Sequence, residues 1–381
     1  MNCLLNGTSK WASLSIAGLA LTALVAGCGT SNGSNTANGS GTAANGTGGQ
    51  GGTQTVTLNE TGSSLLYPLF NDQWIHAYQQ VAPNVRLNAA STGSGTGISQ
   101  ALQGTVQLGA SDAYLPPSTL SSNQGVMNIP LAISAQQVMY NLPGVTGHLK
   151  LTGDVLAKIY QGQIKYWDDP ALTALNPTVK LPHQQIIPVH RSDGSGDTFL
   201  FTQFLTDTNS NWANTVKYST QVSWPSLSTG IGANGNDGVV TTLAENKYSV
   251  GYVGISWLNK AEQKGLGYAA LQNKSGNFVL PETANIQAAV NQMVSQVPTN
   301  EAISLIYAPG AQSYPIINFE YAIVKQQQAD PATAAALKKF LSWAISTNGG
   351  DSAQYMTPVH FLPLPASVAP KSQAQIDNIT G

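Results

Sequence analysis

The segment His190-Arg191-Ser192-Asp193-Gly194-Ser195-Gly196-Asp197-Thr198 leads into the apolar run Phe199-Leu200-Phe201. It places an arginine shortly before a Ser-Gly turn that is typical of a helix start. A helix start presents unpaired backbone N–H groups and a partial positive charge, which suit an anion. The planar guanidinium of Arg191 suits a tetrahedral oxyanion. One Ser-Gly turn alone is more typical of an ordinary capped helix, so further segments are needed to indicate a site.

Two further segments show the same order of strand, Ser/Gly-rich turn and helix. The loop 93–97 (Gly-Ser-Gly-Thr-Gly) follows an alternating strand pattern at 85–89 and precedes a helical pattern at 98–102. Gly62-Ser63-Ser64 follows a strand pattern at 56–58 and leads into apolar residues at helical spacing, which predict a buried stripe. The stripe consists of Leu66, Leu69, Phe70, Trp74, Ala77 and Tyr78. Three such helix starts indicate an anion site much more strongly than one.

An aspartate accompanies these donors. The strand pattern at 106–110 ends in Ser111-Asp112-Ala113. An ionised carboxylate only accepts hydrogen bonds, and hydrogen phosphate carries a proton near neutral pH whereas sulfate carries none. Asp112 in the site would therefore favour phosphate and repel sulfate. As an isolated residue, Asp112 is more typical of a turn cap.

Several of these segments resemble the phosphate-binding proteins of bacterial ABC phosphate importers. The similarity extends in order from about Thr57 to about Pro365 and is greatest to the lipid-anchored members of that family. The segments that carry it are 62–70, 93–97, 109–113, 162–170, 175–177, 191–196 and 234–238.

The resemblance implies a set of phosphate contacts: Ser64, Leu65, Ser94, Asp112, Arg191, Ser195, Gly196 and Asp197. Ser64 stands where some relatives have threonine, which keeps the hydroxyl. Asp197 stands where many have threonine. It is interpreted either as a second acceptor of a ligand proton or as an N-terminal helix residue facing solvent. Asp193 is expected to orient the Arg191 guanidinium rather than to contact the ligand.

The resemblance also implies an α/β fold of two lobes, the type II periplasmic-binding-protein fold, with phosphate in the cleft between the lobes. Two crossover strands would form the hinge, the first at 137–142 and the second within 314–324. Lobe 1 would consist of residues 56–140 plus 318–381, and lobe 2 of residues 141–317. The length and the alternating strand and helix patterns agree with two lobes.

The N-terminus predicts export. A short apolar run follows Lys10 and ends in Val25-Ala26-Gly27-Cys28, which resembles a bacterial lipobox. Residues 1–27 are therefore expected to be a lipoprotein signal peptide, with Cys28 lipidated at the cell membrane; secretion with a free Cys28 is the alternative. Residues 28–55 read as a flexible tether of small polar residues. Cys3 would leave with the signal, so the mature chain is expected to lack a disulfide.

Composition limits the function further. Formal net charge is −2, which does not favour nucleic acid as a partner. Only 9% of residues are charged, well below the usual quarter or so. A surface with few carboxylates changes its charge little on acidification, so we hypothesise that the protein works in an acidic exterior. Drift within a polar surface is the alternative.

The expected function is capture of inorganic phosphate for an ABC permease by a lipid-anchored monomer, without catalysis, cofactor or metal. A phosphate sensor uncoupled from transport is one alternative, and a phosphatase or hydrolase is another. No serine of the predicted site lies in Gly-x-Ser-x-Gly, and the five histidines show no metal-ligand spacing. His190 lies next to Arg191 and is expected to face away from it, because adjacent strand residues point to opposite faces.

Overall fold

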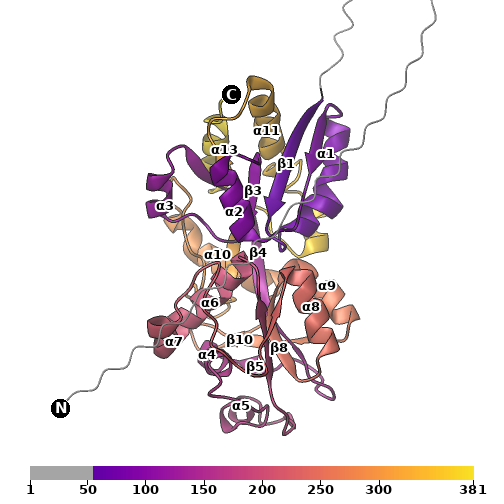
Figure 1. The fold of residues 1–381 in the computed structure, drawn as a ribbon, viewed down its shortest axis with the longest axis vertical. Coiled ribbons are helices and arrows are strands. Elements are labelled where there is room, and N and C mark those ends of the chain that lie inside the picture. Colours follow the sequence, from indigo (N-terminus) through magenta and orange to yellow (C-terminus); the bar gives the residue numbers. More distant parts are fainter. Residues whose placement is uncertain (1–54) are drawn as a thin grey trace, which may run out of the picture. The chain divides into compact units, whose positions relative to one another are not determined.

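The computed structural model describes residues 55–381, and two lobes connected by long strands make up this part of the chain (Figure 1). The predicted signal peptide, Cys28 and all but the last residue of the predicted tether lie outside the described residues. Within residues 55–381, no helix is long and apolar enough to cross a membrane.

Nine of the described strands form one sheet, in the order β2-β1-β3-β12-β4-β8-β6-β7 with β9 paired to β4. Three others form a small sheet in the order β11-β10-β5. The strands are β1 (Val56–Gly62), β2 (Val85–Asn88), β3 (Leu108–Ser111), β4 (Val126–Asn141), β5 (Lys150–Leu151), β6 (Ile187–Arg191), β7 (Ile231–Ala233), β8 (Ser249–Gly254), β9 (Gly267–Tyr268), β10 (Ala270–Gln272), β11 (Phe278–Val279) and β12 (Ile317–Lys325).

Helices follow most of the strands, as the alternating pattern predicts. They are α1 (Ile75–Val81), α2 (Ser94–Gln103), α3 (Pro117–Ser122), α4 (Gly153–Tyr160), α5 (Pro170–Leu175), α6 (Gly196–Thr208), α7 (Ser210–Thr215), α8 (Gly235–Glu245), α9 (Leu258–Gln263), α10 (Thr283–Met293), α11 (Pro331–Ala344), α12 (Ala353–Met356) and α13 (Ala369–Asp377). Short turns of other helix types lie at Leu69–Trp74, Ile255–Trp257, Val294–Gln296 and Thr357–Val359.

Strand β4 joins the two lobes. Its first part pairs with β12 in one lobe, which also holds β1, β2 and β3, and its last six residues pair with β8 in the other lobe. Figure 1 shows β4 running between the two groups of elements. The predicted two-lobed α/β fold is therefore confirmed. The first predicted crossover falls in the second half of β4, and the second overlaps β12. The lobe boundaries at 140/141 and 317/318 stay predictions.

The three predicted strand–turn–helix units are present. Strands β1, β2 and β6 each end just before a turn, and α2 and α6 begin at the two predicted Ser-Gly turns. Strand β3 begins at Leu108, two residues later than its pattern predicts. The predicted apolar stripe is buried except at Ala77, and its aromatic rings pack against α11. Burial of this stripe fixes the helix that follows the first turn against the sheet.

Candidate functional site

Ser63, rather than Ser64, caps the first helix start. The Ser63 hydroxyl accepts hydrogen bonds from the backbone N–H groups of Leu65 (3.1 Å) and Leu66 (3.0 Å). The same hydroxyl donates to Oδ1 of Asp112. A capping serine satisfies otherwise unpaired donors at a helix start, and here it also holds a carboxylate in place. The sequence could have predicted this cap, since Ser63 lies two residues before Leu65, the first residue whose N–H group it accepts from.

Asp112 lies directly after β3 and is 2% exposed. Ser94, the first residue of α2, places its hydroxyl 3.4 Å from Oδ2 of Asp112 and accepts from the Asp112 backbone N–H at 3.3 Å. Burial raises the pKa of Asp112 well above its ordinary value, and the neighbouring carboxyls of Glu320 and Asp197 raise it further. Asp112 therefore takes up a proton more readily than an ordinary aspartate does.

Arg191 is the buried cation of this region. Its Nε and Nη2 donate to the two oxygens of Asp193, and its Nη1 donates to Oδ2 of Asp197 at 2.7 Å. Burial alone would lower the pKa of Arg191, but the two carboxylates outweigh it and raise the pKa. This contact gives Asp193 the expected pair with Arg191, and its lack of contact with the ligand stays a prediction. His190 instead stacks on Trp224, with 4.8 Å between ring centroids, and so faces away from the Arg191 pairs.

The interpretation of Asp197 as an N-terminal helix residue that faces solvent is wrong. Asp197 is 0% exposed at the start of α6, where its Oδ2 also accepts from Asn236 Nδ2 at 2.7 Å and its Oδ1 accepts from Gln136 Nε2 at 3.1 Å. Burial raises its pKa although Arg191 opposes the shift. The physical reason is packing: β4 and α8 both reach the first turn of α6, and sequence pattern does not report contacts of that range.

The start of α6 lies against the start of α2. Ser195 caps α6 by accepting from the Thr198 N–H at 3.3 Å. Gly196 comes next, and a Cβ at that position would lie 2.4 Å from Oδ2 of Asp112 and 2.6 Å from the Ser94 hydroxyl. Only a residue without a side chain allows this approach. The turns also meet directly, because the Gly95 N–H donates to the Gly194 carbonyl at 2.8 Å.

A fourth helix start, that of α8, completes the region. Asn236 donates to the Ser64 hydroxyl from its backbone N–H (3.1 Å) and from Nδ2 (2.9 Å), and it accepts from the Gly254 N–H. Trp257 donates to the Ser64 carbonyl, and Ser256 donates to the Leu65 carbonyl. The segment 234–238 belongs to the resemblance, yet sequence reasoning assigned Asn236 no role. These contacts join the two lobes at the first helix start.

All eight predicted site residues thus lie at or beside the junction of the two lobes, and each is buried. One arginine there pairs with Asp193 and Asp197, and two further carboxyls, those of Asp112 and Glu320, lie close to Asp197. Burying so many negative charges against one positive charge is costly. Some of these carboxyls must therefore hold protons, and the region suits an anion that brings protons of its own.

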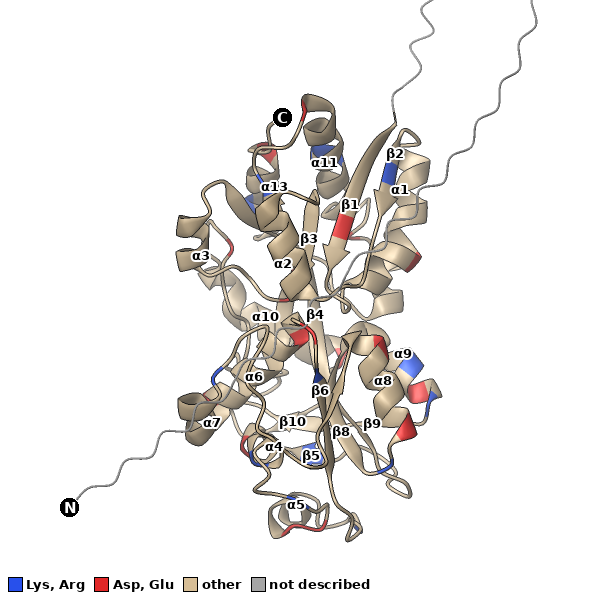
Figure 2. Cartoon of the chain, in the orientation of Figure 1, with Lys and Arg blue, Asp and Glu red and all other residues tan. Residues whose placement is uncertain are grey.

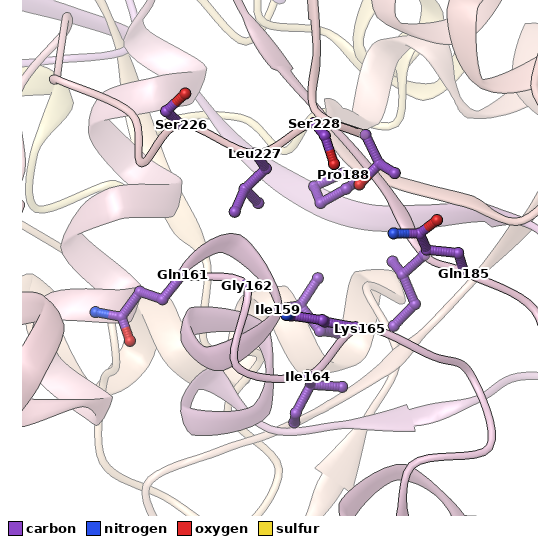
Figure 3. Close-up of a pocket in the computed structure, with 12 residues that line it drawn as sticks. Ile159, Gln161, Gly162, Ile164, Lys165, Gln185, Pro188, Ser226, Leu227 and Ser228 are labelled. Atoms are coloured by element: carbon purple, nitrogen blue, oxygen red, sulfur yellow. The ribbon is translucent and has the colours of Figure 1, made fainter.

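A separate pocket lies away from this junction, in the lobe that contains α4 and β6 (Figure 3). It has a volume of about 270 Å³, and Lys165 is the one charged residue in its lining. Ile159, Gln161 and Leu227 also line it, and none of the eight predicted site residues does. Among residues 55–381, no group of three or more His, Cys, Asp or Glu side chains is placed to hold a metal ion.

The chain resembles known proteins over most of its length. Residues 39–348 match the family model described as a PBP superfamily domain. The phosphate-binding protein PstS of Pasteurella multocida (strain Pm70) is 36% identical over 324 residues, covering 85% of this chain and 90% of that protein. The protein of the same name from Methanocaldococcus jannaschii is 35% identical over 335 residues, covering 83% of this chain and 84% of that protein. The chain belongs to the PstS family of phosphate-binding proteins.

Solved structures agree with a PstS fold. A high-affinity periplasmic phosphate-binding protein (PfluDING), bound with phosphate, superposes with a TM-score of 0.67 at 21% identity, covering 84% of this chain and 93% of that one. A phosphate-binding protein from Stenotrophomonas maltophilia superposes with a TM-score of 0.65 at 19% identity, covering 84% of this chain and 94% of that one. At these identities the likeness shows the fold, and the PstS assignment itself rests on the closer relatives and the family model.

Proposed function

We propose that this protein captures inorganic phosphate between its two lobes and delivers it to a membrane-embedded ABC phosphate importer. The observation that carries the proposal is the meeting of three Ser/Gly-rich helix starts around the carboxyl of Asp112, with Arg191 paired to Asp197 at the third of them. PstS relatives of 35% and 36% identity are named for phosphate binding, which supports the same anion. Binding without catalysis agrees with those names.

The proposed mechanism replaces the water around phosphate with directed protein groups. The backbone N–H groups of Gly196 and Asp197, that of Leu65 on leaving the Ser63 hydroxyl, and the hydroxyls of Ser64, Ser94 and Ser195 would donate to phosphate oxygens. Arg191 would supply a charge-assisted pair. Neutral dipoles from several helix starts hold an anion without burying many positive charges. Each helix start contributes roughly 0.3–1 kcal/mol from its dipole, and the directed hydrogen bonds add to this.

The two proposed acceptors favour a protonated ligand. Asp112 would accept one phosphate proton, and Asp197 would accept a second when dihydrogen phosphate is bound. Arg191 is already paired with Asp193 and Asp197, so it adds little net positive charge to the site. A fully ionised phosphate would therefore meet more negative than positive charge. We propose that the singly charged form binds best.

Replacing Asp112 with asparagine tests the proposed function. The amide can donate to sulfate, whereas the carboxylate repels it. Asp112→Asn is therefore expected to narrow the preference for phosphate over sulfate by roughly 5- to 150-fold, since one unpaired buried acceptor is worth about 1–3 kcal/mol. The measurement is isothermal titration of ligand-stripped protein with phosphate and then sulfate. Wild type should show saturable one-to-one heat with phosphate and none with sulfate.

The Asp154→Asn variant is the matched control, because this half-buried carboxylate lies outside the proposed site and pairs with Lys158 and Asn209. It should leave both titrations unchanged. An unchanged phosphate-to-sulfate ratio in Asp112→Asn would remove Asp112 from the site. No heat with either anion, from folded and ligand-free wild type, would contradict phosphate capture itself.

We further propose that lipidation of Cys28 anchors the protein outside the cytoplasm, with residues 29–55 as the tether, and that lobe 1 (56–140 plus 318–381) and lobe 2 (141–317) close as a monomer. Cys28 follows Val25-Ala26-Gly27, which supports acylation. The tether would keep captured phosphate close to the permease, which raises its local concentration there.

The lipid anchor predicts that Cys28→Ser moves the protein from the membrane fraction to the soluble extracytoplasmic fraction. The serine cannot form the thioether link to lipid, so labelling with a radioactive fatty acid should be lost completely. Cys3→Ser is the matched control and should change neither result, because Cys3 lies within the predicted signal peptide. Retention of labelling in Cys28→Ser would contradict the assignment.

A further inference from the structure

Glu320 is a buried carboxyl that the proposed contacts do not use. It lies in β12 and is 0% exposed. Ser134 of β4 donates to its Oε1 at 2.5 Å, and Asn318 donates to the same oxygen at 3.0 Å. Its Oε2 accepts from no donor among the described residues. A buried carboxylate oxygen without a donor is costly, so this oxygen is the natural place for a proton.

The strand register brings Glu320 to Asp112. Tyr321 pairs with Ser111, the residue before Asp112, so β12 and β3 place the two acids next to each other. A bulge in the β12–β4 pairing falls between Glu320 and Tyr321. A bulge redirects a side chain relative to a regular strand. The two carboxyl groups lie within hydrogen-bonding distance, and Asn318 also reaches the Asp112 carbonyl at 3.4 Å.

The charges around this pair favour one shared proton. Asp112 faces Glu320 from the end of β3, Asp197 acts on it from α6, and Tyr321 is the titratable neighbour on its own strand. From β4 the neighbour is the uncharged Ser134. Burial, together with the Asp197 charge, raises the pKa of Glu320 to about 7 against the opposing hydrogen bonds from its neighbours. Two adjacent buried carboxyls do not both ionise readily, because like charges repel at short range.

We propose that Glu320 is a positioning residue that shares one proton with Asp112, so that the pair carries a single negative charge, the Asp112 carboxyl is oriented and it can still accept a hydrogen bond from protonated phosphate. This inference rests on the proposed function. Ser63 and the proton shared with Glu320 then hold the Asp112 carboxyl from two sides. When the pair loses this proton, a second negative charge lies beside the site. The site then repels the anion, and phosphate affinity falls.

The test is the pH profile of phosphate binding in Glu320→Gln, measured on the full chain by isothermal titration. Glutamine can keep Oε1 as the acceptor from Ser134 and present an N–H to Asp112 at every pH. The ratio of the wild-type to the variant Kd is expected to stay near one at about pH 5.5 and to rise to about tenfold at about pH 8.5. Taking the ratio cancels the ionisation of phosphate itself. A ratio that stays constant across this range would overturn the inference.

A second variant keeps Glu320 and changes the pH at which its carboxyl ionises. Ser134→Ala removes a donor that favours ionised Glu320. Its loss of affinity should therefore begin at higher pH than in wild type, and an unshifted profile would contradict the role of Glu320. Asp351→Asn is the matched control. Asp351 is a buried carboxyl that accepts from the Leu364 N–H, so its removal should leave the profile unchanged.

The outcomes separate two failures. Phosphate binding with a flat Kd ratio would remove the role of Glu320 and leave phosphate capture standing. No phosphate binding by folded wild type at any pH would remove the proposed function, and the role of Glu320 with it.

Discussion

Replacing Arg191 with alanine is expected to weaken phosphate binding by roughly 10²- to 10⁴-fold, because two charge-assisted hydrogen bonds contribute about 1.5–3 kcal/mol each. The guanidinium is 3% exposed and held by Asp193 and Asp197, so its geometry is set before ligand arrives. Such preorganisation reduces the entropy lost on binding. Isothermal titration with phosphate measures the effect.

Loss of Arg191 also endangers folding, because removing one partner of a buried ion pair costs about 3–5 kcal/mol. The double variant Arg191→Ala with Asp197→Asn separates the two effects. It removes a carboxylate left without its cation, so stability in urea should recover while affinity stays low. Arg86→Ala is the matched control, since Arg86 is exposed and contacts only Asn88 through Nε. Phosphate binding by the double variant near the wild-type level would contradict the role of Arg191.

The free energy of unfolding is expected to fall by on the order of 5 kcal/mol as pH rises from about 5 to about 8. Burial raises the pKa of Glu301 from 4.5 to about 7 and that of Asp351 from 3.8 to about 8. Both groups bind a proton more tightly in the folded chain than in the unfolded chain. Their stabilising contribution is therefore complete below the unfolded pKa and is lost as pH rises through the folded pKa.

Urea unfolding at a series of pH values measures this dependence. Asp351→Asn and Glu301→Gln should each flatten it, since an amide carries no titrating proton. Asp237→Asn is the control, because Asp237 is exposed and pairs with Lys260 on the surface. Stability that stays constant or increases between about pH 5 and about pH 8 would contradict the prediction.

This direction agrees with the hypothesis of an acidic exterior. Figure 2 shows that charged residues are sparse on both lobes, in keeping with 9% charged residues in the sequence. Few surface carboxylates limit the loss of stability in acid, and buried protonated carboxyls add stability there. Both effects favour stability in acid. The low number of charged residues follows from the composition, whereas the buried carboxyls are known only from the structure.

Local sequence was sufficient for the elements that carry the site. Strand alternation, Ser-Gly turns and apolar spacing act within a few residues, and they predicted the start of α6 correctly, whereas α2 begins at Ser94, four residues before the expected helical pattern at 98–102. They did not predict the cap of the first turn, where Ser63, next to the predicted phosphate contact Ser64, accepts from two backbone N–H groups. Both serines have the same chemistry, and the difference depends on the backbone path between β1 and the helix.

The amino-acid order alone therefore established the strand–turn–helix units, the two-lobed α/β class and the residue types suited to an oxyanion, because these depend on short-range patterns and on family resemblance. Which groups face one another came from packing between distant segments. Ser63 meets Asp112 across 49 positions, Asn236 meets Ser64 across 172, and Ser134 meets Glu320 across 186. Packing between distant segments also buries Asp197, which one interpretation of the sequence placed at the surface, and makes it a partner of Arg191. Burial and neighbouring charge set the protonation of a carboxyl, and both exist only once the lobes have packed.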